Sequence, residues 1–177
     1  MSDTTRAQVV DAVDLLNDFI GDCVASVMVL RTYAVGLQAK PNDGTALVAL
    51  HKMCISYIVL TLYKWIEFYR KYQRVIPQEL LNECKELTKK LERKDIIAFR
   101  HKCIGHIWDD EQGRPLFNTE IMDRLNKIID NNLDAFLNWV HDPKGSVYPT
   151  TIVSIVETLR DALARRHQID PKEIIER

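Results

Sequence analysis

Apolar residues recur at intervals of three and four along most of the chain, which is the periodicity of helices that bury one face. The first such stretch starts at a candidate N-cap, Asp3, Thr4 or Thr5, and runs to about Gln38. Its apolar side consists of Val9, Val13, Leu16, Ile20, Val24 and Val27. A second long stretch, residues 46–74, is apolar on more than one face, which predicts the central helix of a bundle.

Shorter periodic segments follow, and Gly and Pro mostly fall between them. They predict helices over residues 78–93, where Pro77 precedes the first turn, and over 95–109, 118–140 and 150–166, joined by turns or loops at 39–45, 109–118 and 141–149. No segment alternates with the period of a strand. The sequence therefore predicts an all-α, up-and-down helical bundle of five to six helices in a single domain of residues 1–177, with its core at about 5–166 and a polar C-terminal tail at 167–177.

Composition and charge narrow the function classes only a little. The 177 residues include 24 Lys and Arg against 25 Asp and Glu, a net charge of −1, so the whole-molecule charge favours no nucleic acid or other charged partner. We expect no membrane association and a cytoplasmic location, because no apolar run is long enough to span a bilayer and no signal peptide is evident. The cysteines form no CxxC pair, which predicts buried free thiols: Cys23, Cys54, Cys84 and Cys103.

The segment 95–109, DIIAFRHKCIGHIWD, departs from this ordinary pattern. It places Arg100, His101, Lys102 and His106 within seven residues, beside a buried apolar stripe. Charged and imidazole groups cost free energy to desolvate unless they are paired or used. On an ideal α-helix, the side chains of Arg100 and His106 would point about 120° apart. Gly105 lowers the helix propensity locally and would allow the backbone to deform.

FRHKCIGH resembles the R-x4-6-H signature of the HEPN superfamily, small helical-bundle proteins of prokaryotic defence and toxin–antitoxin systems. His101 stands where that family usually has a polar residue after the arginine, and IGHIWDD resembles the ending of the motif in abortive-infection-type members. The resemblance implies a HEPN-like fold and a metal-independent endoribonuclease, a toxin or phage-defence effector. It also implies a homodimer that cleaves RNA at its interface without a cofactor, with a cognate antitoxin protein as a further partner.

The residue types suit such chemistry, because RNA carries its own nucleophile, the 2′-hydroxyl. An imidazole exchanges protons near neutral pH, and a guanidinium binds phosphate oxygens while it stays charged. We therefore assign His106 to proton transfer and Arg100 to the phosphate. His101 would orient the site or contact the RNA backbone. Residues 83–102 carry seven basic and four acidic side chains, a local excess of three positive charges. The predicted RNA contacts lie in this segment: Lys102, Lys94 and Arg93.

Other interpretations of the same residues stay open. Arg100 would have a purely structural role if it paired with Asp95 or Asp109, and His106 if it were a hydrogen-bonded boundary residue. Lys89, Lys90, Arg93 and Lys94 would form a solvated helix face. A metal site built on His101 and His106 is disfavoured, because i,i+5 spacing turns the rings about 140° apart on an α-helix. The alternative function is a non-catalytic helical interaction protein, such as an antitoxin, an immunity protein or a scaffold.

Overall fold

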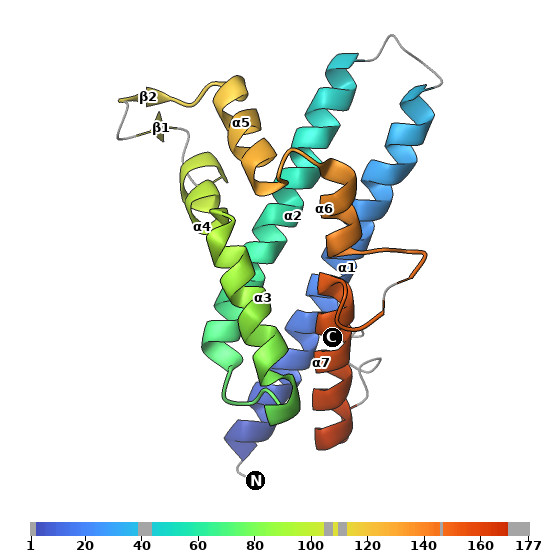
Figure 1. The fold of residues 1–177 in the computed structure, drawn as a ribbon. Helices are drawn as coiled ribbons and strands as arrows, with labels where there is room; N and C mark the ends of the chain where they lie inside the picture. Colours follow the sequence, from blue (N-terminus) through green and yellow to red (C-terminus); the bar gives the residue numbers. More distant parts are fainter. Residues whose placement is uncertain (1–2, 39–43, 105–107, 110–112, 146, 170–177) are drawn as a thin grey trace.

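The computed structural model describes residues 3–38, 44–104, 108–109, 113–145 and 147–169, and these form an all-α bundle, as predicted (Figure 1). Two long antiparallel helices, α1 (Asp3–Gln38) and α2 (Gly44–Tyr72), are followed by shorter helical segments. These are the 3-10 turn η1 (Gln78–Leu80), α3 (Leu81–Arg93), α4 (Ile96–Phe99), the π-helical η2 (Arg100–Ile104), α5 (Asn118–Ile128), α6 (Leu133–Val140) and α7 (Ile152–His167).

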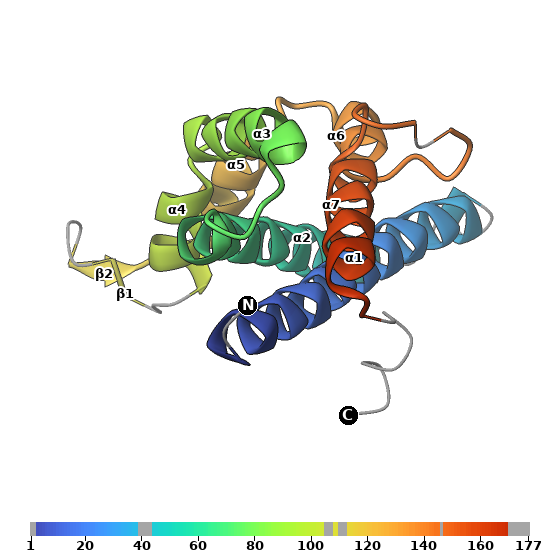
Figure 2. The same ribbon diagram turned by 90° about the horizontal axis from the view of Figure 1, so that it is seen from below.

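The core lies between the α1–α2 pair and the shorter helices, which cover one side of that pair (Figure 2). Most of the apolar side predicted for α1 is buried in it, whereas Val24 is only half-buried. Trp65 of α2 is fully buried, and its indole Nε1–H donates to the Thr88 hydroxyl of α3 at 3.0 Å. The Thr88 hydroxyl in turn donates to the Cys84 carbonyl at 2.8 Å, so α3 is held against α2 by a buried polar contact.

The predicted helix over 118–140 is two helices, which corrects the sequence interpretation. Asp130 and Asn131 adopt left-handed conformations with φ of 54° and 53°, and these end α5. Asn132 then caps α6 by accepting a hydrogen bond from the Ala135 N–H at 3.0 Å. Asp and Asn tolerate left-handed backbone and bond to nearby backbone groups, so the run Asp-Asn-Asn breaks an apolar stripe that otherwise continues through both helices.

Two very short strands are the second departure from prediction. β1 (Trp108–Asp109) pairs antiparallel with β2 (Arg114–Pro115), with Trp108 opposite Pro115. Strands of two residues are too short to show an alternating pattern, so the sequence carries no signal for them, and the predicted all-α class is confirmed. Beyond β2, the Glu120 carboxylate accepts a hydrogen bond from the Phe117 N–H at 2.8 Å and so satisfies a backbone donor at the N-terminus of α5.

The described helices include none whose length and hydropathy would let it cross a bilayer. The prediction of buried thiols is confirmed at Cys23, Cys54 and Cys84, while Cys103 is half-buried, and none of the four forms a disulfide. Burial raises the pKa of the Cys84 thiol to about 12, so this thiol is protonated at neutral pH.

Candidate functional site

The predicted motif helix begins at an abrupt change of chain direction. Lys94 follows the last turn of α3, and Asp95 then takes a left-handed conformation with φ of 61° before α4 starts at Ile96. Asp95 stands at the N-cap position of α4, but its side chain makes no capping hydrogen bond. The left-handed residue turns the chain so that α3 and the motif are separate segments.

From Arg100 to Ile104 the backbone is π-helical rather than α-helical. A π turn closes i→i+5 hydrogen bonds and holds more residues than an α turn, and such turns occur frequently at functional sites. The separation of about 120° expected for Arg100 and His106 assumed an ideal α-helix, so it does not apply here. His106 itself lies outside the described residues, as does Gly105.

Arg100 and His101 form one cluster on the aromatic ring of Tyr63. Arg100 Nη1 lies 3.2 Å from His101 Nδ1. Because a guanidinium only donates hydrogen bonds, Nδ1 is the acceptor, and the neutral ring therefore carries its proton on Nε2. The guanidinium carbon lies 5.1 Å from the centroid of the Tyr63 ring, and the His101 ring meets that ring edge-on at 6.2 Å. Tyr63, which sequence reasoning missed, thus connects both residues to α2.

The cluster is open to solvent: His101 is exposed and Arg100 is half-buried. Among the described residues Arg100 makes no ion pair, so the structural alternative of an Arg100–Asp95 pair is not realised. The Asp109 side chain lies outside the described part of the chain. Lys102 is half-buried and has contacts of its own. The arrangement leaves a fixed positive charge and an imidazole N–H side by side at the surface.

Lys94 joins α3 to the C-terminal end of α5. Its Nζ donates to the Ile128 carbonyl at 2.9 Å and to Asp130 Oδ2 at 2.6 Å, and it lies 5.7 Å from the centroid of the Trp139 ring. Only 12% of its side chain is exposed, against 76% for Asp130. A cation near the C-terminus of a helix is favourable for the helix dipole. Lys94 therefore has a structural role, and its assignment as an RNA contact stays a prediction.

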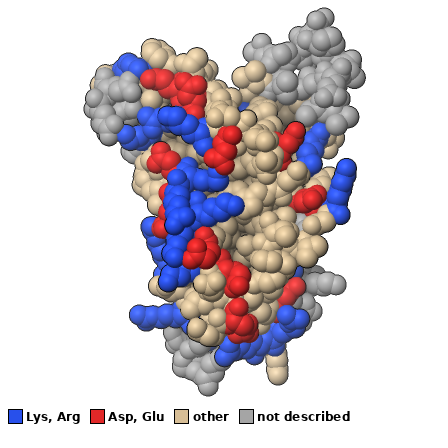
Figure 3. All heavy atoms as spheres, in the orientation of Figure 1, with Lys and Arg blue, Asp and Glu red and all other residues tan. Residues whose placement is uncertain are grey.

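A cleft of about 410 Å³ opens beside Lys94. We call it the basic cleft; its lining residues are Arg93, Lys94, Asp95, Phe99, Arg124, Lys127, Ile128 and Asp130. Figure 3 shows Lys and Arg side chains gathered on this side of the molecule, over α3, α4 and α5. Sequence reasoning found Arg93 and Lys94 but missed Arg124 and Lys127. Their i,i+3 spacing marks one face of α5, but nothing in the sequence places that face beside α3.

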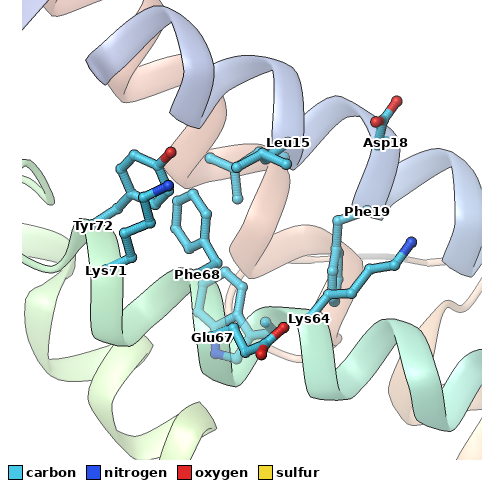
Figure 4. A pocket seen from close by; sticks show the side chains of 10 residues that line it. Leu15, Asp18, Phe19, Lys64, Glu67, Phe68, Lys71 and Tyr72 are labelled. Carbon is cyan, nitrogen blue, oxygen red and sulfur yellow. The ribbon is translucent and has the colours of Figure 1, made fainter. Parts of the chain in front are cut away.

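A second cavity, of about 240 Å³, lies between α1 and α2 (Figure 4). Leu15, Phe19 and Phe68 form its apolar wall, and charged side chains such as Asp18 and Lys64 stand at its edge. Its lining contains no histidine or cysteine and none of the motif residues. Within the described residues, no three His, Cys, Asp or Glu side chains are grouped so that they would hold a metal ion.

Comparison with known proteins establishes the fold alone. No family model matches the chain, and no curated protein matches it. Among solved structures, the chain is similar to the integron cassette protein Vpc_cass2 from the mobile metagenome of V. paracholerae, with a TM-score of 0.75 and 22% sequence identity over 93% of this chain and 98% of that one. The bundle therefore occurs in a mobile-cassette protein.

Proposed function

We propose that this protein is a metal-independent endoribonuclease of the HEPN type. The observation that carries the proposal is the Arg100–His101 pair on Tyr63, exposed on a π-helical turn and without an ion-pairing carboxylate among the described residues. A cation that served only the fold would more commonly be paired with a carboxylate. An arginine beside an imidazole instead suits a phosphodiester substrate.

In the proposed reaction, the ribose 2′-oxygen attacks the adjacent phosphorus and the bond from phosphorus to the 5′-oxygen breaks. The products are a 2′,3′-cyclic phosphate and a 5′-hydroxyl. Arg100 binds the non-bridging oxygens as negative charge builds up on them, and His101 orients the guanidinium through Nδ1. His106, assigned from the sequence, takes the proton of the 2′-hydroxyl.

The leaving 5′-oxygen needs a proton of its own, so the proposal includes a homodimer in which His106 of a second copy supplies it. Lys102, Lys94 and Arg93 are the proposed contacts to the rest of the RNA. In the cell, we propose a cytoplasmic toxin or phage-defence effector that is controlled by a cognate antitoxin protein.

The test is RNA cleavage by the purified protein in the presence of EDTA. We expect wild type to yield 2′,3′-cyclic phosphate ends, and Arg100→Ala and His106→Ala each to lower the rate at least about 100-fold, the usual range for the loss of a proton-transfer group or a charge-stabilising donor. Arg74→Ala is the control, because it removes one arginine from an exposed position beyond the end of α2, away from the motif in the sequence. If cleavage by Arg100→Ala or His106→Ala equals that by Arg74→Ala, the assigned site is wrong.

A non-catalytic interaction protein is the second candidate, and one observation favours it. Large apolar side chains are exposed on the α1–α2 pair, among them Leu15 at 46%, Met53 at 61% and Tyr57 at 42%. Exposed apolar groups of this size are frequent at protein interfaces. Induction in a bacterial host separates the two candidates: the nuclease halts growth and His106→Ala relieves the arrest, whereas an interaction protein leaves growth unaffected in both cases.

A further inference from the structure

The basic cleft is a second site, separate from the cluster on Tyr63. Phe99 lines the cleft, and Arg100 follows it directly in the chain. Four of the lining residues are cations and two are carboxylates, which leaves a net charge of +2 around the opening. The cations come from two helices, Arg93 and Lys94 from α3 and its end, Arg124 and Lys127 from α5. Two helices that are not consecutive in the sequence thus supply charge to one hollow.

These charges are not used equally by the fold. Lys94 neutralises Asp130 through an ion pair of 2.6 Å and is largely covered. Arg93 and Lys127 are exposed, and neither has a carboxylate within ion-pair distance among the described residues. They are therefore available to a ligand. An arginine fork and a lysine ammonium that line one hollow suit the oxygens of a phosphate group.

The positive field extends from the cleft towards α6. Lys90 lies 4.2 Å from the centroid of the Trp139 ring, and Lys94 approaches the same ring. Burial, and then the charge of Lys94, lower the pKa of Lys90. A half-buried indole beside two lysines is a feature of surfaces that bind a nucleic-acid strand. The cationic surface is thus longer than a single phosphate requires.

We infer that the basic cleft binds backbone phosphates of single-stranded RNA, through Arg93 and Lys127, and so positions the strand whose neighbouring phosphate reaches Arg100. This inference rests on the proposed ribonuclease function for its substrate, but it concerns binding, which can be measured without cleavage. An acidic protein segment, which is negatively charged as RNA is, would be the competing ligand.

The test uses a short fluorescein-labelled single-stranded RNA with 2′-O-methyl riboses, which lacks the attacking hydroxyl and cannot be cleaved by this chemistry. Its binding to the full chain is followed by fluorescence anisotropy over a series of salt concentrations. The double variant Arg93→Ala/Lys127→Ala is compared with Arg74→Ala/Lys85→Ala, which removes the same charge from exposed positions outside the cleft lining. Far-UV circular dichroism checks that both fold.

We expect the cleft variant to bind about tenfold more weakly. We expect the slope of log affinity against log salt to fall by about 1.4, because each single-strand phosphate contact contributes about 0.7. The control variant should change neither. Equal losses in the two variants, or displacement of the RNA by polyglutamate as readily as by polyphosphate, would overturn the inference. If wild type binds the RNA through the cleft but cleaves no RNA, the inferred binding site stands and the proposed ribonuclease function is refuted. If wild type cleaves RNA but the cleft variant binds the labelled RNA as tightly as wild type, the ribonuclease function stands and the inferred binding site is refuted.

Discussion

Replacing Thr88 with valine keeps the size and shape of the side chain but removes the only oxygen that accepts the Trp65 indole N–H among the described residues. Both groups are buried, at 0% exposure for Trp65 and 5% for Thr88, so water does not readily replace the lost acceptor. Leaving a buried donor without a partner costs about 1–3 kcal/mol. Because this contact holds α3 on α2, its loss should destabilise the packing of α3 against α2, next to the motif and the basic cleft.

Thr61→Val is the matched control. Thr61 is fully buried, and its hydroxyl donates to the Tyr57 carbonyl four residues earlier at 3.0 Å, as Thr88 does to Cys84. It accepts no hydrogen bond from another described side chain. Both substitutions therefore remove one bond to a helix carbonyl and add one buried methyl group, and only Thr88→Val also leaves a donor unpaired.

Urea unfolding followed by tryptophan fluorescence measures the difference. We expect the free energy of unfolding of Thr88→Val to lie about 1–3 kcal/mol below that of Thr61→Val, with the same dependence on urea. In a thermal scan, this corresponds to a midpoint lower by about 2–4 °C for each kcal/mol. Equal stability of the two variants would show that the indole N–H gains nothing from Thr88, and the account of how α3 is held would be wrong.

Three further predictions concern the ends of helices and titrating groups. Asn132→Ala removes the cap of α6 and should lower the free energy of unfolding in urea by about 1 kcal/mol. Hydrogen bonds from Arg114 and then from the Phe117 N–H lower the pKa of Glu120 to about 2, so the stability that the ionised Glu120 contributes is lost as the pH falls from 4.5 through 2. In Glu120→Gln, the free energy of unfolding should therefore depend less on pH in that range. Burial lowers the pKa of His51 below 6.5, so the unfolded state takes up its proton first and stability falls as the pH drops below 6.5; His51→Gln should remove that part of the thermal-midpoint profile.

The sequence predicted helices wherever an apolar stripe met clear end signals. The bounds of α1 agree with the pattern, because its buried positions repeat regularly from Val9 to Val27. Periodicity could not reveal the break between α5 and α6, since Ile128, Ile129 and Leu133 continue the apolar stripe across it. Only the backbone preferences of the Asp-Asn-Asn run marked the break. A prediction made from apolar periodicity alone does not take these local preferences into account.

The candidate site was predictable only as far as neighbours in the sequence determine it. The motif places Arg100 and His101 next to each other in the sequence, but it predicted no hydrogen bond between their side chains. The contact of Arg100 with the Tyr63 ring depends on how η2 lies against α2. The presence of Arg93 and Lys127 in one cleft depends on how α5 lies relative to α3. Such relations are set by the whole core, so a single sequence carries no local signal for them.

The distribution of ion pairs refines what the charge count indicated. Residues 83–102 carry an excess of three positive charges, but the fold uses part of them: Lys89 pairs with Glu86 at 2.7 Å and Lys94 with Asp130 at 2.6 Å. Glu92 is itself paired with Arg70, so it does not offset Arg93, one residue further along. The cations of this segment that make no ion pair with a described residue are then Lys85, Lys90, Arg93 and Arg100. Two of these, Arg93 and Arg100, lie at the end of α3 and at the start of η2. They attract a polyanion to the surface beside the motif, because surface charges act over only about 10 Å at ordinary salt concentrations.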